Sequence, residues 1–542
     1  MVLVLLGHTY VPCDMFRVNK MPDHLTRRNF LQKSCLTAAS LAFAGLIPAC
    51  SGLKVQTLPN IDYAKGLNLR NCNIVDVKTG KIIKNVTIMI RNQMIVRITK
   101  HKPYHSYDTT EIDIQNQYVL PGLIDAHCHT TMPSAMKYSL TRLMTNYRQI
   151  QRNFVQQIQS GVTTVRDMGA LPLVLKNMLE KVNNGQFPGP RVKYCNAITN
   201  AYGGHPDIFL KDISLLAPYL TWMTGKSNLW YTGTRDLVEK FKKNVVGASF
   251  VKLTMDEQSI FCGKNRIPSY EQEDLRIIFR LAKQNNIPVA GHILTKYGFD
   301  RALHHGIHSM EHTIGDATLS AREIQLMAQK KCAIVPTMIM AQIFSAEEAM
   351  TELPDQYRTD FIMNELKNRR NYIYAAHNNF VEPEIHQDNQ KTLTLFQQYS
   401  CREMYQKGII QSNPELFFGA LRYGPDHLKQ MHDAGVLIGC GTDAGVPFIY
   451  PGMMFLELEL LSRIGFANED IIRFATINNA KILRMENSIG SIEQEKLADL
   501  VIVHDNPLIH LKTIRKPKIV IKDGQVAYYQ KNQLKLLTQN SS

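Results

Sequence analysis

The feature that most constrains this chain is a series of short apolar runs, each ending in a residue that can bind a metal ion. The first run, residues 118–126, leads into His127, Cys128 and His129. Alternate side chains of a β-strand face the same way, so the two histidines would point to one side and Cys128 to the other. Two imidazoles at this spacing can bind one ion. A lone strand-end histidine is usually an ordinary core or surface residue, so a metal site requires further ligands.

Four further candidates lie downstream, each at the end of another apolar run: Lys252, His292, His312 and Asp443. The apolar runs alternate with helical stretches, a pattern that predicts parallel βαβ units. The strands expected to form the sheet cover residues 123–127, 163–166, 192–197, 249–253, 288–293, 309–312, 333–337 and 436–440. Eight such strands can close into one barrel, where the side chains at their carboxyl ends converge on one mouth.

Several short motifs along the chain match one family in order. Pro-Gly-Leu-Ile-Asp-Ala-His-Cys-His at 121–129, Lys252, Ser-Met-Glu-His at 309–312 and Gly-Thr-Asp at 441–443 resemble the landmarks of the amidohydrolase superfamily. The resemblance covers about residues 66–535 and is closest to lysine-carboxylated Xaa-Pro and Xaa-Arg dipeptidases, which are prolidase-like. It implies an α/β fold: a (β/α)8 TIM barrel with a small composite β-sandwich domain built from both termini.

The resemblance also implies a centre of two divalent metal ions. His127, His129 and Asp443 would hold one ion and His292 and His312 the other, while a carbamate formed from CO2 on Lys252 would bridge the pair. A lysine ammonium would be repelled by two cations, so a lysine among metal ligands makes chemical sense only as an anion. Imidazole and carboxylate ligands favour zinc, although they also admit manganese or cobalt.

The predicted reaction is hydrolysis of an amide or peptide bond in a small substrate, such as a dipeptide or an N-acyl amino acid. Two ions can hold a bridging hydroxide and polarise a carbonyl. Asp443 would accept a proton from that hydroxide and pass it to the leaving nitrogen. In the loop Tyr-Gly-Gly-His at 202–205, Tyr202 and His205 are candidates for binding substrate. By similarity to those dipeptidases, His205 is also a candidate for stabilising the oxyanion, and an ordinary turn histidine is its alternative.

Other interpretations stay open. A mononuclear cyclic-amide hydrolase or deaminase, imidazolonepropionase-like, would use the histidines and Asp443 without a carbamate, and metal stoichiometry separates it from the binuclear enzyme. Lys252 would then be a strand-end lysine paired with Asp256 or Glu257. A lipoprotein that binds metal without turnover is the non-enzyme alternative, and the complete ligand set argues against it. Arg166 could bind a substrate carboxylate, but an internal ion pair is favoured.

The first fifty residues resemble a Tat-type lipoprotein signal. Arg27 and Arg28 precede an apolar run at 35–47 that is too short to span a bilayer comfortably. The run closes at Leu-Ile-Pro-Ala-Cys, which resembles a lipobox whose Cys50 would be lipidated. This predicts export through the Tat pathway to the bacterial cell envelope, with a lipid anchor in the membrane. A frayed N-terminal helix is the alternative.

The rest of the chain divides by composition and pattern. Residues 51–65 are a polar linker, 66–118 and 488–535 the two parts of the β-sandwich, 119–487 the barrel and 536–542 a tail. About a hundred residues, 338–433, separate the seventh and eighth strands, and helical patterns at 346–350, 360–378 and 391–407 predict an inserted helical cap. A cap beside the mouth would shape specificity.

Charge and cysteine content exclude some functions. The formal net charge is +15, but the basic residues are scattered without an aromatic-interleaved stripe, so no nucleic-acid partner is predicted. The ten cysteines form no Cys-x-x-Cys pair, which argues against a disulfide framework and a zinc finger. Barrels of this superfamily often associate, so the resemblance admits a homo-oligomer.

Overall fold

The computed structural model describes residues 61–100, 109–135, 142–205, 228–258, 266–345, 359–374, 381–398 and 414–533. The predicted signal segment with Cys50, most of the linker and the tail lie outside these ranges. The chain divides into two compact units, Met1–Lys54 and Val55–Ser542, and every described residue belongs to the second. Within the described ranges, no helix has the length and apolar character needed to cross a membrane.

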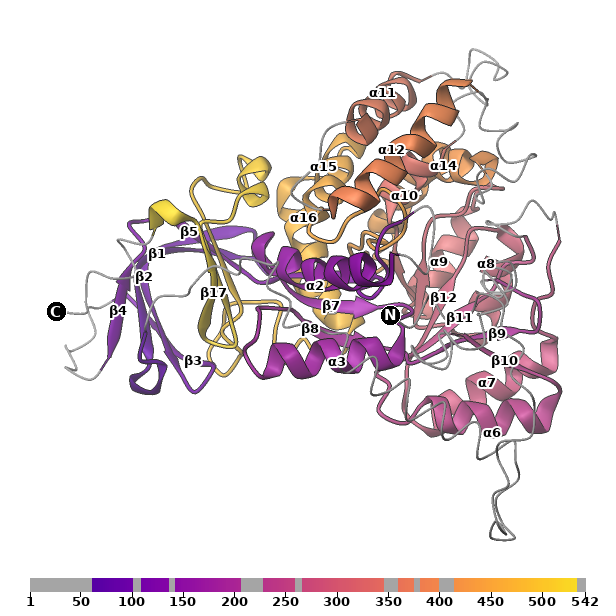
Figure 1. Cartoon of the computed structure of the whole chain (residues 1–542), viewed down its shortest axis with the longest axis horizontal. Coiled ribbons are helices and arrows are strands. Elements are labelled where there is room, and N and C mark those ends of the chain that lie inside the picture. The colour runs from indigo at the N-terminus through magenta and orange to yellow at the C-terminus, as the bar shows by residue number, and fades with distance from the viewer. Residues whose placement is uncertain are drawn as a thin grey trace, which may run out of the picture. The chain divides into compact units, whose positions relative to one another are not determined.

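Segments from both ends of the described chain form one eight-stranded sheet (Figure 1). The strand order is β17-β16-β15-β5-β1-β2-β3, and β4 pairs with β1. The strands are β1 Leu67–Asp76, β2 Lys81–Arg91, β3 Met94–Thr99, β4 Thr110–Asp113, β5 Tyr118–Pro121, β15 Leu500–Val503, β16 Ile519–Lys522 and β17 Gln525–Tyr529. Their inward-facing Ile, Leu and Val side chains form a core of their own, because alternate residues of each strand share one face.

The region between these ends contains two parallel sheets. One has the order β6-β7-β8 and the other the order β10-β9-β11-β12-β13-β14. The strands are β6 Leu123–Cys128, β7 Val162–Asp167, β8 Arg191–Tyr194, β9 Ile198–Ala201, β10 Asn228–Tyr231, β11 Val251–Thr254, β12 Val289–His292, β13 Ser309–Glu311 and β14 Ala333–Val335. The prediction of an α/β fold with parallel strands is confirmed. Strand β10 was not expected from the sequence.

Helices connect most of these strands: α2 Leu143–Gln159, α3 Pro172–Asn183, α6 Thr234–Asn244, α7 Gln272–Gln284, α8 Lys296–His305 and α9 Ala321–Gln329. Local sequence explains several of their ends. Ser320 and Glu323 form a capping box that begins α9, and the Thr295 side chain caps α8. Gly306, at φ +77°, ends α8 in the left-handed conformation that glycine adopts without strain.

Backbone hydrogen bonds join the two parallel sheets on both sides. Ser249 N donates to Tyr194 O at 2.9 Å, which ties the start of β11 to β8. On the other side the segment predicted as the eighth strand, residues 436–440, lies between β14 and β6. It forms an isolated parallel bridge from Ile438 to Ile334, and Ala126 N donates to Cys440 O at 3.0 Å.

The prediction of a regular strand at 436–440 is wrong, and the Asn479 side chain explains why. Its Oδ1 accepts from Cys440 N at 2.9 Å, and its Nδ2 donates to Cys440 O at 2.7 Å and to Ile124 O at 2.5 Å. The Asn479 amide therefore stands between Cys440 N and Ile124 O, two groups that a continuous parallel ladder would join directly. Asn479 lies in the helix α17, Asn479–Ile482, so its position depends on how this helix packs.

We expect Asn479→Leu to lower the free energy of unfolding by about 3 kcal/mol, because it removes the side-chain partner of the buried Cys440 N and Ile124 O. Denaturant unfolding of the purified variant would measure this loss. Asn183→Leu, a change at an exposed position, is the control. An equal and small effect of the two substitutions would show that Asn479 does not join these segments.

Helices occupy much of the predicted insertion. They are α10 Met338–Phe344, α11 Asp360–Tyr374, α12 Pro383–Gln398 and α14 Pro414–Asp433. Helix α12 begins eight residues before the predicted 391, α14 was not expected, and the helix predicted at 346–350 lies outside the described residues. After the insertion come α15 Met454–Ile464, α16 Asn468–Arg473, the π-helical turn η5 Phe474–Asn478 and α17. Short 3-10 turns lie at η1 Tyr63–Lys65, η6 Leu511–Arg515 and η7 Lys531–Gln533.

Candidate metal centre

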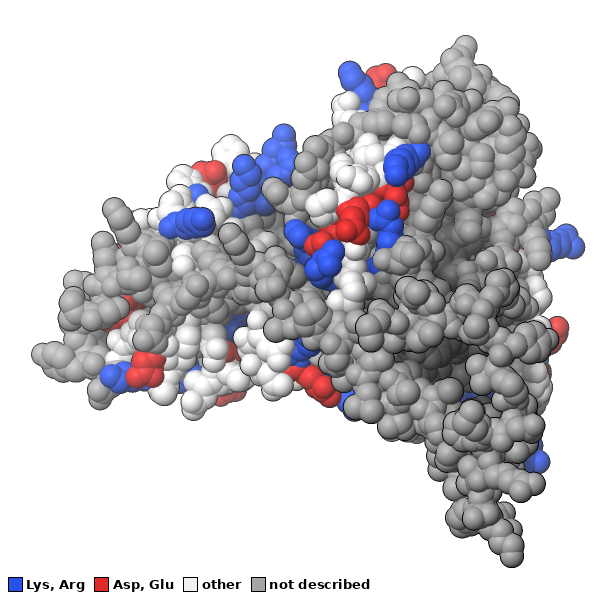
Figure 2. All heavy atoms as spheres, viewed as in Figure 1, with Lys and Arg blue, Asp and Glu red and all other residues white. Residues whose placement is uncertain are grey.

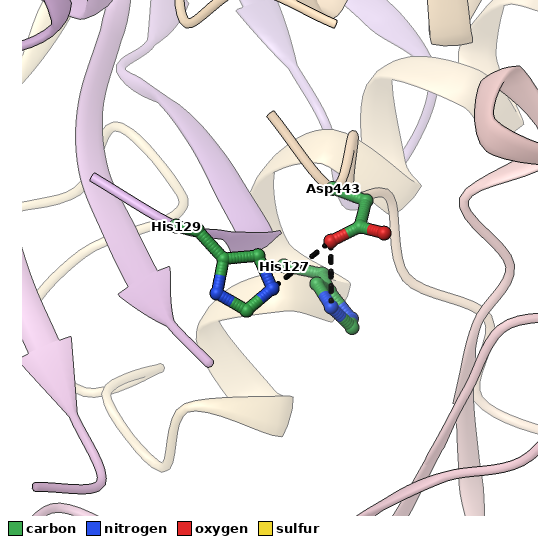
Figure 3. A group of neighbouring side chains, drawn as sticks. All are labelled: His127, His129 and Asp443. Atoms are coloured by element: carbon green, nitrogen blue, oxygen red, sulfur yellow. Dashed lines mark ion pairs between the residues drawn. The ribbon is translucent and has the colours of Figure 1, made fainter. Parts of the chain in front are cut away.

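Three of the predicted ligands meet in one buried group (Figure 3). His127 belongs to β6, His129 follows it directly, and Asp443 follows the segment 436–440. Asp443 Oδ1 lies 3.3 Å from His127 Nε2 and 3.1 Å from His129 Nε2. Ligand atoms of the three residues lie within 4.8 Å of one another, close enough to bind a single ion.

A second pair of predicted ligands lies beside this group. His292 ends β12 and His312 follows β13, and His312 Nε2 is 2.8 Å from His292 Nδ1. The rings of His312 and His127 have centroids 4.7 Å apart, so the pair adjoins the first group. Two ring nitrogens this close can share a proton or bind one ion together.

Lys252 enters the same region from β11. Its side chain is almost fully buried, and its Nζ has no hydrogen-bond partner among the described residues. Burial lowers the pKa of Lys252 to about 8, so part of the amine is neutral at physiological pH. A buried amine without a partner costs free energy, and a carbamate at this position would remove that cost by turning the side chain into a metal ligand. The site fits this group.

The pairing of Lys252 with Asp256 or Glu257 is not found. The Asp256 carboxylate accepts from Leu294 N at 2.9 Å and from Thr295 Oγ1 at 2.8 Å. Glu257 Oε2 accepts from the same Thr295 hydroxyl at 3.0 Å. Both carboxylates therefore bind the start of α8.

Hydrogen bonds at Nδ1 fix the tautomers of three histidines. His127 Nδ1 lies 3.0 Å from Glu311 Oε2, and His129 Nδ1 lies 2.9 Å from Gly169 O. His312 Nδ1 lies 2.6 Å from Thr337 Oγ1, whose hydroxyl donates to Pro336 O at 2.8 Å. All three oxygens therefore accept, so each Nδ1 carries a proton and each Nε2 is the ring nitrogen left to bind a metal ion. In the structure these Nε2 atoms contact other members of the centre: Asp443 Oδ1 for His127 and His129, and His292 Nδ1 for His312.

Glu311 and Arg166 form a buried ion pair behind His127. Arg166 Nη2 lies 2.7 Å from Glu311 Oε1, and Ser309 Oγ donates to the same oxygen at 2.6 Å. Burial alone would raise the pKa of Glu311, but Arg166 and His127 hold it well below its usual value. The pair confirms the favoured internal role of Arg166. Sequence reasoning missed Glu311, although its place beside a predicted ligand, in Ser-Met-Glu-His, was a signal.

The loop at 202–205 brings His205 to the centre, while Tyr202 lies at the surface. The rings of His205 and His292 have centroids 4.8 Å apart. Burial, together with the charge of Lys252, lowers the pKa of His205 to about 3, so its imidazole is neutral. A Cβ at Gly204 would lie 2.7 Å from Pro268 O, so this tight loop requires glycine. Tyr202 is 54% exposed, and its ring packs edge-on against Trp230.

Three residues of the centre have left-handed backbones. The φ angles are +74° at His312, +58° at Asp443 and +45° at Thr337. Such conformations cost of the order of 1–3 kcal/mol each for residues other than glycine, and they gather at functional sites. The surrounding packing therefore holds two candidate ligands and one supporting residue in strained positions.

Comparison with known proteins shows which family this chain resembles. The profile of the Amidohydrolase family matches residues 118–527. Ochratoxinase from Aspergillus niger is 20% identical over 460 residues, covering 81% of this chain and 82% of that protein. Adenine deaminase from Clostridium acetobutylicum is 44% identical over 80 residues, only 15% of this chain and 13% of that protein.

Solved structures show the same fold. A Xaa-Pro dipeptidase with methionine bound in its active site has a TM-score of 0.63 at 22% identity, covering 86% of this chain and all of that chain. The crystal structure of A. niger ochratoxinase has a TM-score of 0.60 at 19% identity, covering 87% of this chain and 97% of that one. The family match spans well over half of the sequence, and it includes every residue of the buried centre. The chain therefore belongs to the amidohydrolase family.

Proposed function

We propose that this protein hydrolyses an amide or peptide bond in small substrates, namely dipeptides or N-acyl amino acids, at a centre of two divalent metal ions. The observation that carries the proposal is the convergence of six donor side chains in one buried region. They are His127, His129, Lys252, His292, His312 and Asp443. Zinc is the first choice, since the donors are imidazoles and carboxylates.

The proposed architecture is a closed (β/α)8 barrel, with residues 119–487 as the catalytic domain and 338–433 as its helical cap. The backbone bonds that tie β11 to β8, and residues 436–440 to both β14 and β6, support closure. We further propose that residues 66–118 and 488–535 form a composite β-sandwich, which the shared eight-stranded sheet supports. The mouth of such a barrel would bring the strand-end ligands together.

Within this centre, Lys252 would react with CO2. A bond forms between its neutral Nζ and the carbon of CO2, and one proton leaves, so that the ammonium is replaced by an anion with two oxygens. One ion would be held by His127, His129 and Asp443, and the other by His292 and His312. The Lys252 carbamate would bind both ions. Two divalent ions held in this way would lower the pKa of a water molecule and polarise the substrate carbonyl.

Asp443 and His205 have defined roles in this scheme. Burial would raise the pKa of Asp443, but His127 and His129 hold it well below its usual value, so the carboxylate is ionised and can accept a proton. It would then pass the proton to the leaving nitrogen. His205 is neutral and lies beside His292, so it can donate a hydrogen bond to the oxyanion that forms from the carbonyl.

A substrate screen tests the proposal. We expect zinc-loaded protein to cleave members of a panel of dipeptides and N-acyl amino acids, and chelation of the metal to abolish the cleavage. Long peptides are the comparison, since a barrel mouth under a cap admits only a few residues. Cleavage inside long peptides, with all dipeptides left intact, would contradict the proposal.

A deaminase or cyclic-amide hydrolase remains the second candidate, because a short stretch matches adenine deaminase at 44% identity. It would release ammonia from adenine or open a cyclic amide with a single metal ion. The same screen should include adenine and cyclic amides, with ammonia release as the readout. Turnover of these compounds alone would favour this candidate.

We also propose that residues 1–50 are a Tat lipoprotein signal. Replacing Arg27 and Arg28 together by lysine should block export, since the pathway reads the arginine pair. Cell fractionation of a tagged chain would measure this, and Cys50→Ser should leave export intact while releasing the protein from the membrane. Unchanged envelope localisation of the double lysine variant would contradict the assignment.

A further inference from the structure

Helix α12 of the insertion contacts both chain segments that carry ligands of the first metal. One segment runs from His129 through residues 130–135, and the other runs from Asp443 through residues 444–453. They are held together directly, since His129 N donates to Ala444 O at 2.6 Å. Gly445 approaches so closely that a Cβ there would lie 2.2 Å from His129 O. The relative position of the two segments therefore sets the separation of His129 and Asp443.

Asn389 of α12 bonds to both segments. Its side chain is fully buried, and its Nδ2 donates to Ser134 O at 3.0 Å and to Tyr450 Oη at 3.1 Å. Ser134 in turn donates from its N to Gly445 O at 2.9 Å and from its Oγ to Ile449 O at 3.2 Å. One amide thus binds a carbonyl on the His129 segment and a hydroxyl on the Asp443 segment.

Helix α12 is itself held against α2, the helix that follows β6. Glu382 lies just before α12. Its Oε1 is 2.7 Å from Arg152 Nη2, and its Oε2 is 3.2 Å from Arg148 Nε. Its backbone N donates to Gln149 Oε1 at 2.6 Å, and Asp388 pairs with Arg142 at 3.0 Å. Acidic side chains flanked by basic ones are visible where α12 meets α2 (Figures 1 and 2). The end of α12 that carries Asn389 is therefore fixed to the barrel region.

We propose that Asn389 is a positioning residue of the metal centre, through which the insertion holds His129 and Asp443 at the separation that one metal ion requires. The insertion thereby supports the ligands of the centre as well as covering it. Asn389 acts through its hydrogen bonds to Ser134 and Tyr450, which lie on the two segments that carry His129 and Asp443. The inference rests on the proposed metal centre, and it predicts an effect on metal affinity at one of the two ion sites.

The test compares Asn389→Leu with Glu382→Gln in the full chain. Leucine keeps roughly the volume of the side chain but removes both donated hydrogen bonds. We expect the affinity for one of the two zinc ions, measured by competition with a chromophoric chelator, to fall about 10- to 100-fold, as is usual when support of a metal ligand is lost. Excess zinc should restore turnover. Glu382→Gln removes one negative charge but keeps the backbone bond to Gln149 and the Asp388–Arg142 pair that hold α12 in place, so its zinc affinity should stay within about threefold of wild type.

A second variant keeps the inference falsifiable if Asn389→Leu does not fold. Tyr450→Phe removes only the hydroxyl that accepts from Asn389, and it should lower zinc affinity in the same direction by a smaller factor. Unchanged zinc affinity in the Asn389 or Tyr450 variant, or an equal loss in Glu382→Gln, would overturn the positioning role. Wild-type protein that binds fewer than two zinc ions would instead contradict the proposed function, so the two failures are distinguishable.

Discussion

Replacing Lys252 by alanine is expected to remove at least one of two bound metal ions and nearly all hydrolytic activity. The amine is buried and has no hydrogen-bond partner in the part of the chain that the structure describes, and as a carbamate it would supply two oxygens that could bridge both ions. Metal analysis of the purified variant, together with turnover of a cleaved dipeptide, would measure both losses. The fold should persist, because the alanine removes a buried polar group for which the described residues offer no partner.

Chemical rescue separates the carbamate from a merely structural lysine. A short carboxylic acid added to Lys252→Ala could supply the missing oxygens, so part of the metal content and activity should return. Lys252→Arg is the matched control: its guanidinium stays cationic and fills the space, so the acid should not rescue it. Fully active protein with one metal per chain, unchanged in Lys252→Ala, would refute the binuclear mechanism and favour the mononuclear cyclic-amide hydrolase or deaminase.

Replacing Asp443 by asparagine is expected to lower turnover by roughly two orders of magnitude or more, since general acid–base groups typically contribute 10²–10⁴-fold. The amide keeps the shape and one oxygen ligand, so the fold and most of the metal should remain. Metal content and kcat measured on the same preparation would separate loss of metal from loss of proton transfer. Near-native turnover would remove Asp443 from the proton-transfer role.

A control for this substitution should change a carboxylate outside the centre. Asp316 accepts from Lys296 N at 2.7 Å, at the start of α8. Asp316→Asn carries the same chemical change but should leave turnover within about twofold of wild type. An equal effect of the two substitutions would point to stability, and not to proton transfer, as the cause.

Most of the parallel strands, and the candidate ligands at their ends, could be predicted from the sequence. Strands of a parallel sheet appear as apolar runs separated by helical stretches, and their carboxyl ends face one side. A ligand-type residue at the end of such a run, as with His292 or Asp443, is therefore placed by local pattern alone. The two-residue period of a strand likewise predicts that His127 and His129 point to the same side.

The supporting residues could not be predicted in this way, because their partners are distant in the chain. Glu311 orients His127 only because β13 lies near β6, and Arg166 reaches Glu311 across 145 positions of sequence. Asn479 replaces a ladder partner of residues 436–440 only because α17 packs beside Cys440. Such long-range contacts leave no periodic pattern in the local sequence.

The sequence by itself determined which residue types stand at the strand ends, since alternation and strand length are local properties of the chain. The tertiary structure alone decided which nitrogen of His127, His129 and His312 faces the centre, that Lys252 has no hydrogen-bond partner among the described residues, and that α12 contacts both segments through Asn389. Each of these depends on donors and acceptors brought together by packing. A buried polar group must find its partner in three dimensions, whatever its distance along the chain.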